Sequence, residues 1–376
     1  MKTILQVTGT MDRGGAEMML MDLVRQLHKD FCFKFLVVTK KGSRPKGDFD
    51  EELKSLGIEI YYIDAVWDVG VKEFSRQFKL IVEQIGHIDV VHSHLNSKGG
   101  IISKCAAKAG IKKIIVHSHA KLKFDGSIVS KIANYTELYI QRYWINKYAT
   151  DYWACSKEAL SSLFTKKHCE CQNAQVIHNA IDLEKFSRYS GETIRDELNI
   201  PNDAFVIGTV GRIAKVKNYE FAADVIKALW DRGFDCHYVV AGRKQSESSA
   251  NYLFEKLSND PHFHYVGVCE DLPALYHSFD LYLGTSLREG LGLTAVEAQA
   301  SGVNCVLSSG FPTLCDVGAN LVSFVEGNDP IKWADYIINN YSEIKIVDTN
   351  EIENAVRNSG FDILAEAVIV KEIYNS

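Results

Sequence analysis

Short apolar runs of strand length alternate along the chain with longer stretches whose apolar residues recur at helical spacing. The spacing from Met18 to Leu27, for example, predicts a helix directly after the first apolar run. Strands that alternate with helices in this way predict a parallel, doubly wound sheet of the α/β class. In the first half, strands are expected at Ile4–Val7, Phe33–Thr39, Ile58–Ile63, Val90–His92 and Lys113–His117, with two further strand ends near Ser156 and Asp182.

The second half repeats this organisation after a break. The segment 183–204 is polar and closes with a turn at Pro201, and a new strand begins at Phe205. We therefore expect two domains, 1–186 and 187–359. In the second, strands are expected at His237–Gly242, Val266–Gly267, Asp280–Gly284 and Val303–Leu307, and helices at Trp333–Tyr341 and Asn350–Tyr374.

Composition narrows the class of protein. A chain of 376 residues with 46% apolar and 24% charged residues is long enough for two globular cores. The net charge of −6 gives no support to nucleic-acid binding. The amino terminus enters a strand at once, with no signal-like apolar core, and no run of eighteen apolar residues occurs. Nine scattered cysteines indicate reduced thiols. We expect a cytoplasmic protein.

The most informative stretch runs from Thr285 to Gly302. It reads as a loop with Gly290, Leu291 and Gly292, then a helix that Gly302 ends. Bare amide N–H groups at the start of a helix suit a phosphate. Glu289 and Glu297, the latter about two turns into the helix, need another ligand, because carboxylates repel phosphate and accept hydrogen bonds from sugar hydroxyls. The pattern indicates a nucleoside diphosphate sugar site, with an ordinary capped helix as the alternative.

A second glycine loop follows the strand at Phe205. Gly211 is succeeded by Arg212, Lys215 and Lys217, ahead of a helix expected from about Tyr219 to Trp230. A guanidinium can bind phosphate through two parallel hydrogen bonds, and an ammonium binds it as a point charge. This loop is either an anion site or a solvated basic turn.

The glycines after the first strand do not form a P-loop. Gly9 and Gly14 have the Walker-A spacing, but Gly15-Ala16 stands where Lys-Ser/Thr is required. What remains is a glycine turn at the carboxyl end of a parallel strand, where open α/β sheets bind ligands.

Two other features have the composition of metal sites. Asp48 and Asp50 precede a charged helix, and we interpret them as acids favoured by the helix dipole. The pairs His92/His94 and His117/His119 end two neighbouring strands, but no acidic or cysteine ligand accompanies them. We predict that the protein needs no metal.

The segment 121–148 is basic and aromatic. A cationic helix with aromatic side chains can rest on anionic lipid headgroups, and the alternative is a helix packed on its own domain. Its residues are Lys121, Lys123, Phe124, Lys131, Tyr135, Tyr139, Arg142, Tyr143, Trp144, Lys147 and Tyr148.

Five motifs in order resemble retaining glycosyltransferases of family 4, most of all those of bacterial capsular and exopolysaccharide synthesis. They are Gly14-Gly15-Ala16-Glu17, His117-Ser-His119, Asn179-Ala-Ile-Asp182, Gly211-Arg212 with Lys217, and the stretch from Glu289 to Glu297. The resemblance implies the GT-B fold, two Rossmann-like domains facing across a cleft, with a carboxyl-terminal helix of about 360–376 packed on the first domain. The family usually has Pro at Gly292, so glycine is expected to loosen that loop.

The resemblance also implies roles. Gly14 and Gly15 belong to a loop that closes over the donor, and Arg212 and Lys217 hold its diphosphate together with the amides of the Gly290–Gly292 loop. Glu289 positions the sugar, Glu297 holds the ribose, and His119 supports the sugar near the reacting carbon. The donor is expected to be a nucleotide sugar, with uridine the favoured base, and the acceptor a saccharide or lipid-linked saccharide. The alternatives are a sugar-nucleotide epimerase of the same fold and a non-catalytic sugar-nucleotide-binding protein.

Overall fold

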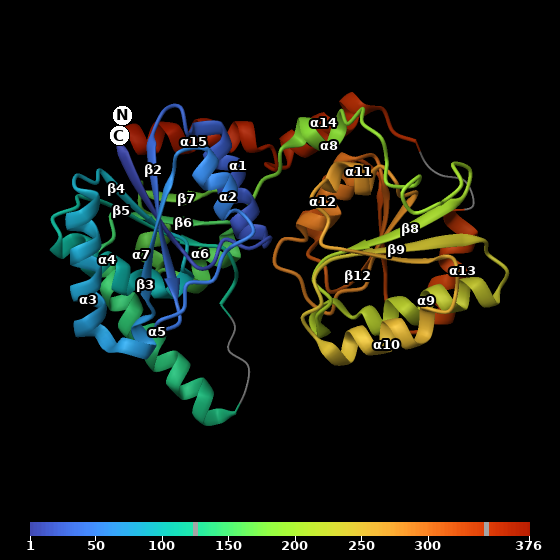
Figure 1. The fold of residues 1–376 in the computed structure, drawn as a ribbon, viewed down its shortest axis with the longest axis horizontal. Helices are drawn as coiled ribbons and strands as arrows, with labels where there is room; N and C mark the ends of the chain where they lie inside the picture. The colour runs from blue at the N-terminus through green and yellow to red at the C-terminus, as the bar shows by residue number, and fades with distance from the viewer. Residues whose placement is uncertain (123–126, 342–345) are drawn as a thin grey trace. The chain divides into compact units, whose positions relative to one another are not determined.

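The computed structural model describes residues 1–122, 127–341 and 346–376. Within them the chain forms two compact units (Figure 1). Unit 1 comprises Met1–Ala180 with Ile363–Ser376, and unit 2 comprises Ile181–Asp362. The chain leaves unit 1 at Ala180, a few residues before the boundary expected at residue 186, and returns to it for its last helix.

Unit 1 is built on a seven-stranded parallel sheet of order β3-β2-β1-β4-β5-β6-β7. Ile4 of β1 lies in one hydrophobic core and its neighbour Leu5 in another, so both faces of the sheet are buried. Double burial explains why these strands read as continuous apolar runs. The strands are β1 Thr3–Thr8, β2 Cys32–Thr39, β3 Glu59–Asp64, β4 Val90–Ser93, β5 Lys113–Ser118, β6 Asp151–Ala154 and β7 Ala174–Val176.

Helices cover both faces of this sheet (Figure 1). The last helix packs beside the first, because α15 contributes Ile363, Val370 and Tyr374 to the core that contains α1. The helices of unit 1 are α1 Gly15–Leu27, α2 Asp50–Ser55, α3 Val66–Ile85, α4 Gly99–Lys108, α5 Ile128–Tyr148, α6 Lys157–Leu163, α7 Lys166–Cys169 and α15 Ile363–Asn375.

Unit 2 repeats the topology with a six-stranded parallel sheet of order β10-β9-β8-β11-β12-β13. Its strands are β8 Phe205–Val210, β9 Cys236–Ala241, β10 Phe263–Gly267, β11 Leu281–Gly284, β12 Asn304–Ser308 and β13 Val322–Val325, the last of them not predicted. Its helices are α8 Leu183–Ser187, α9 Tyr219–Asp231, α10 Glu247–Leu257, α11 Leu272–Tyr276, α12 Leu293–Ala300, α13 Pro330–Tyr341 and α14 Thr349–Asn358. Two doubly wound parallel sheets confirm the predicted fold class.

The predicted helical stretch from Asn350 to Tyr374 is interrupted. It divides into α14 and α15 around Gly360, whose φ of +79° stops a right-handed helix. The break falls where the chain passes from unit 2 to unit 1.

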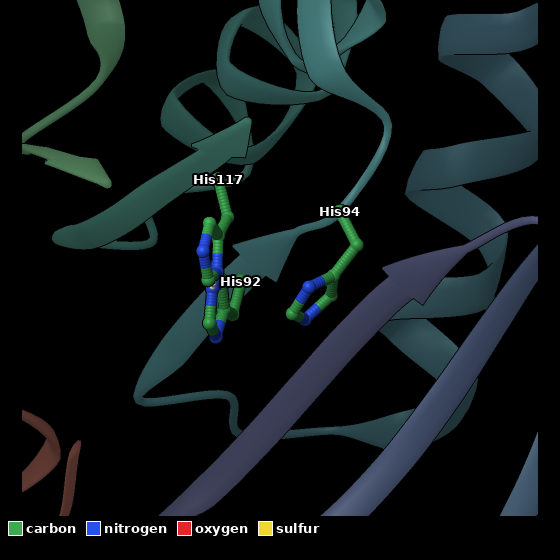
Figure 2. A group of neighbouring side chains, drawn as sticks. All are labelled: His92, His94 and His117. Carbon is green, nitrogen blue, oxygen red and sulfur yellow. Dashed lines mark hydrogen bonds between the residues drawn. The ribbon is translucent and has the colours of Figure 1, made fainter. Parts of the chain in front are cut away.

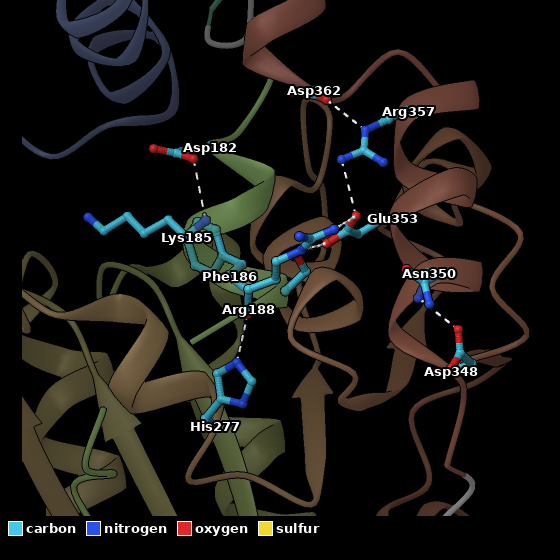
Figure 3. A network of polar contacts seen from close by, with 11 residues as sticks. Asp182, Lys185, Phe186, Arg188, His277, Asp348, Asn350, Glu353, Arg357 and Asp362 are labelled. Atoms are coloured by element: carbon cyan, nitrogen blue, oxygen red, sulfur yellow. Dashed lines mark hydrogen bonds and ion pairs between the residues drawn. The ribbon is translucent and has the colours of Figure 1, made fainter. Parts of the chain in front are cut away.

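A network of charged side chains ties the first helix of unit 2 to its last (Figure 3). The buried Glu353 of α14 accepts two hydrogen bonds from Arg188, at 2.6 and 2.9 Å, and one from Ser187 at the end of α8. Arg357 bridges Glu353 to Asp362. These bonds, chiefly those from Arg188, lower the pKa of Glu353 to about 2, so its carboxylate stays ionised.

Among residues 1–122, 127–341 and 346–376, no helix combines the length and the apolar content needed to cross a bilayer. Lys123 and Phe124 of the basic aromatic segment lie outside the described residues.

Candidate active site

The topology of unit 2 brings two of the predicted loops together. β8 and β11 are neighbours, while the chain continues from them to opposite edges of the sheet. The carboxyl ends of such a strand pair are where open α/β sheets bind ligands. Arg212 and Lys217 follow β8, and the stretch from Glu289 to Glu297 follows β11, so the predicted residues share one edge.

Backbone contacts join the two loops. The N–H of Leu287 donates to the carbonyl of Val216 at 2.8 Å. The Thr285 hydroxyl lies 3.1 Å from the carbonyl oxygens of both Lys217 and Asn218. The loops therefore form one structure, and a displacement of either one moves the other.

Lys217 and Glu289 form an ion pair that the sequence did not predict. Lys217 Nζ lies 2.7 Å from Glu289 Oε1, and both side chains are largely buried. The hydroxyl of Ser286 donates to the same oxygen at 2.6 Å. The pair keeps both charges compensated, and a bound anion would compete with Glu289 for the ammonium group.

Arg212 differs from Lys217. Its side chain is exposed, and no described residue forms a hydrogen bond or ion pair with it. The backbone beneath it is fixed, because Tyr219 donates to the Gly211 carbonyl at 2.6 Å and a Cβ at Gly242 would lie 1.9 Å from that same oxygen. Arg212 is thus an available cation on a rigid loop.

The start of α12 offers unpaired backbone donors. In the described part of the chain, no group accepts a hydrogen bond from the amides of residues 290–294. Gly292 precedes the helix with φ +72°, and a Cβ there would come within 2.9 Å of Phe311. Proline cannot adopt a positive φ. The proline that is usual in the family would therefore not fit the left-handed conformation of Gly292, and the looser loop stays a prediction.

Glu297 is the fifth residue of α12, little more than one turn from its start rather than the expected two. Its side chain is buried, and its Oε2 accepts a hydrogen bond of 2.7 Å from Tyr276. Burial, together with the Glu297 charge, raises the pKa of Tyr276, which keeps the phenol a donor. This partner was not predicted, because Tyr276 reads in the sequence as a core residue.

The turn after β12 supports Glu289 and was also missed. The Glu289 N–H donates to the Gly310 carbonyl at 2.8 Å, and a Cβ at Gly310 would lie 1.9 Å from the Ser286 oxygen. Ser308 donates to that Ser286 oxygen at 2.6 Å. The Ser-Ser-Gly sequence directly after a predicted strand is the signal that indicates such a turn.

In unit 1, Gly14 precedes α1 and Gly15 is its first residue. The loop before them is closed by a hydrogen bond from the Gly14 N–H to the Asp12 carbonyl, and the Arg13 N–H donates to Asp48. Asp50 starts α2 in a buried position, where it accepts a hydrogen bond from Tyr62. Both aspartates thus have structural partners.

His119 follows β5 and is half-buried. Both of its ring nitrogens have protein partners: Nδ1 lies 3.0 Å from Asn179 Oδ1, and Nε2 lies 2.8 Å from His94 Nδ1. Burial lowers the pKa of His119 to about 4, so the ring is neutral near pH 7. The histidine and Asn179 of two separate motifs are therefore brought together.

Comparison with known proteins identifies both halves of the chain. Residues 13–185 match the model of Glycosyltransferase Family 4, and residues 190–354 match that of Glycosyl transferases group 1. EpsF of Bacillus subtilis, which its name assigns to the glycosyltransferases, is 31% identical over 89% of this chain and 87% of its own. The chain belongs to family 4 of the glycosyltransferases.

Other relatives agree with this membership. CapH of Staphylococcus aureus, a glycosyltransferase of capsular polysaccharide biosynthesis, is 27% identical over 99% of this chain and 98% of its own. Among solved structures, that of Anabaena HepE with UDP and glucose covers 100% of both chains at 17% identity and a TM-score of 0.75. Sucrose-phosphate synthase of Thermosynechococcus elongatus covers 100% of this chain and 98% of its own at 15% identity and a TM-score of 0.70. The predicted family and the GT-B fold are confirmed.

Proposed function

We propose that this glycosyltransferase moves a sugar from a nucleoside diphosphate sugar to a saccharide or lipid-linked saccharide acceptor, with retention of anomeric configuration. The observation that supports the proposal most strongly is the set of groups found at one edge of the sheet of unit 2. Two adjacent strands are followed there by an exposed guanidinium, an ammonium paired with a carboxylate, and the amides at the start of α12. Cations and amides suit a diphosphate, and the carboxylates suit sugar hydroxyls.

The proposed chemistry is breakage of the anomeric C–O bond, which leaves negative charge on the departing diphosphate. Arg212, Lys217 and the α12 amides meet that charge, and each strong, preorganised donor contributes about 3 kcal/mol of transition-state stabilisation. Glu289 and Glu297 hold hydroxyls of the sugar and the ribose. The acceptor attacks on the face that the diphosphate leaves, so no residue is assigned as a covalent nucleophile.

We propose a uridine-linked donor, a choice supported by the UDP bound to HepE, a protein of the same fold. The test is nucleotide release from a panel of uridine, guanosine and thymidine diphosphate sugars, with slow hydrolysis as readout. Release from one uridine-linked sugar alone is the expected result, whereas release from guanosine- or thymidine-linked donors only would overturn this choice.

Incubation with the donor alone separates transfer from epimerisation. A transferase returns the donor sugar unchanged apart from slow hydrolysis, whereas an epimerase converts it without any acceptor. Tight donor binding with no turnover over a broad acceptor panel would favour a binding protein instead.

Metal independence is part of the proposal, because the cations at this edge take the place that a divalent ion has in other transferases. Full activity is therefore expected in EDTA. Loss of activity in EDTA with recovery on adding Mn²⁺ or Mg²⁺ would contradict it and reopen the question of Asp48 and Asp50.

We also propose that α5 rests on the cytoplasmic surface of an anionic membrane. Its first half extends beyond the sheet of unit 1 (Figure 1), and its packed face contains Leu138, Gln141 and Ile145. A second apolar face is exposed, formed by Ile128, Val129, Ile132, Tyr135, Tyr139 and Tyr143.

The charges beside this second, exposed face indicate what kind of surface it contacts. Lys131 and Lys147 are exposed on α5, and Glu137 is its one acid within residues 127–148. Basic side chains beside tyrosines and isoleucines match anionic headgroups and the acyl boundary beneath them.

Flotation with vesicles tests this contact. Binding is expected to anionic but not to zwitterionic vesicles, and Ile132→Asp with Tyr139→Asp should abolish it. Leu80→Asp, at an exposed leucine of α3, is the control that should leave binding intact. Equal binding by the double variant, or a dimer that the double variant disrupts, would overturn the membrane contact.

A further inference from the structure

The two histidine pairs of unit 1 belong to one continuous hydrogen-bonded chain. His92 Nδ1 lies 2.6 Å from the Tyr374 hydroxyl, and its Nε2 lies 3.3 Å from His117 Nδ1. Gln6 donates to the same hydroxyl at 2.9 Å. The Gln6 oxygen lies 2.8 Å from His94 Nε2, and His94 Nδ1 in turn faces His119. This hydrogen-bonded chain of side chains therefore runs from His117 through Tyr374 of α15 to His119.

A metal ion is the obvious alternative occupant of this cluster. One nitrogen each from His92, His94 and His117 lies within 4.8 Å of the others, and the three rings gather in one place (Figure 2). Yet both nitrogens of His92 and both of His94 are already hydrogen-bonded to other groups. Metal binding would break those bonds and bury a divalent charge without a carboxylate. The hydrogen-bonded chain accounts for the cluster better.

Burial lowers the pKa of His92, His94 and His117 well below the usual value, so these rings are neutral near pH 7. A neutral imidazole has one donor nitrogen and one acceptor nitrogen. Each link consequently fixes the next, and the whole chain has a single direction.

One of the two possible directions is the one that the Gln6 amide gives as it is placed. Because its amide N–H donates to the Tyr374 oxygen, the Tyr374 hydrogen goes to His92 Nδ1. The Gln6 oxygen must accept from His94 Nε2–H, which leaves His94 Nδ1 as an acceptor. His94 Nδ1 then accepts from His119 Nε2–H.

The Asn179 oxygen at His119 Nδ1 gives the opposite direction, and the two agree once one of these amides takes its other orientation, which has the same shape. We infer that, in either direction, Gln6, His94 and Tyr374 are positioning residues that hold His119 in a single tautomer. The inference rests on the proposed function, in which His119 supports the sugar. Its new content is that a tyrosine of the last helix sets the hydrogen-bonding character of a residue that follows β5.

The tautomer can be read directly from ring-nitrogen shifts of ¹⁵N-histidine-labelled full-length protein. In the wild type, His119 should show the shifts of a single tautomer, with one ring nitrogen protonated and the other not. Tyr374→Phe keeps the ring that packs on Phe31 and Trp153 but removes the hydroxyl. His119 should then show averaged shifts of both tautomers, and kcat should fall about tenfold with an unchanged KM for the donor. Tyr152→Phe is the control, since among the described residues its hydroxyl donates only to the Ala149 carbonyl, outside the hydrogen-bonded chain.

Gln6→Glu is a second variant that does not depend on the first. Its carboxylate accepts from both His94 and Tyr374, so His119 should hold the Nε2–H tautomer and His92 the Nδ1–H tautomer, whichever direction the wild type has. Unaltered His119 shifts in Tyr374→Phe would overturn the inference, as would averaged shifts of both tautomers in the wild type. A changed tautomer with wild-type kcat would overturn the positioning role alone. Absence of transfer by the wild type itself would instead refute the proposed function. The nitrogen shifts would still test whether the hydrogen-bonded chain fixes the tautomer of His119.

Discussion

At the scale of single side chains, the pairing of Lys217 with Glu289 changes how substitutions in this site act. The residues lie 72 positions apart, so no local pattern predicted the contact, although the type and location of each side chain were predicted. A substitution of either residue leaves the charge of the other without its partner. Arg212, by contrast, is an exposed side chain, and its removal leaves no described residue without a bonding partner.

Arg212→Ala and Lys217→Ala are each expected to lower turnover by about two orders of magnitude, because each removes a donor to the developing diphosphate charge. Nucleotide release measured at saturating donor reads out the effect, and a cooperative thermal transition shows that the variants fold. Its midpoint should be unchanged in Arg212→Ala and lower in Lys217→Ala, where Glu289 loses its partner. Lys215→Ala is the matched control, an exposed cation of the same loop. Near-normal turnover of both variants would remove the leaving-group argument.

At the scale of elements, the alternation of apolar runs predicted the strands other than β13, because both sheets are covered by hydrophobic cores on both faces. It also placed the glycine loops at strand ends. Conformations that depend on distant packing were not predictable. The left-handed Gly292 rests on Phe311, and Gln6 meets Tyr374 across 368 residues of sequence.

The two glycines before α12 are expected to respond differently to alanine. Gly292→Ala forces a Cβ into a left-handed conformation, at about 1–2 kcal/mol, and into contact with Phe311 and Cys315. The start of α12 should shift, with a lower unfolding midpoint and weaker nucleotide binding by calorimetry. Gly290→Ala has open space at its Cβ and no positive φ, so its unfolding midpoint should stay at the wild-type value. Equal behaviour of the two variants would contradict this account.

The Glu353 network makes a pH-dependent contribution to unit 2. The pKa of the Glu353 carboxyl is lowered from 4.5 to about 2. The stabilisation that the charged carboxylate gives to the folded state is therefore complete above pH 4.5 and is lost as the pH falls toward 2. Glu353→Gln should lower the free energy of unfolding by about 1.5–3 kcal/mol at pH 7. In urea titrations, the difference from wild type should shrink between pH 4.5 and 3. Glu351→Gln, on the exposed side of α14, should show no such difference. A difference that does not depend on pH would rule out the charged network as its source.

At the scale of the whole molecule, the chain completes unit 1 only after it has built unit 2. The last helix, α15, supplies Ala367 and the three larger side chains Ile363, Val370 and Tyr374 to a core whose other buried members all precede residue 181. Each fully buried side chain of this size contributes about 1.5–3 kcal/mol. The three together approach the total stability of a domain, about 5–15 kcal/mol. Unit 1 should therefore depend on its last helix, whereas unit 2 should not.

A chain that ends at Asp362 tests this dependence. Limited proteolysis with mass spectrometry should show rapid cleavage throughout Met1–Ala180 and a resistant fragment of about Ile181–Asp362, because the remaining unit keeps its own cores. Removal of Ser376 alone should leave both units resistant, since this exposed residue lies after the helix. If the shortened chain protected unit 1 as well as the full one does, α15 would be a peripheral cover rather than part of the core. Tyr374 is lost together with this helix, so His119 should also lose its fixed tautomer in the shortened chain. The last helix would then support both the core of unit 1 and the residue proposed to support the sugar.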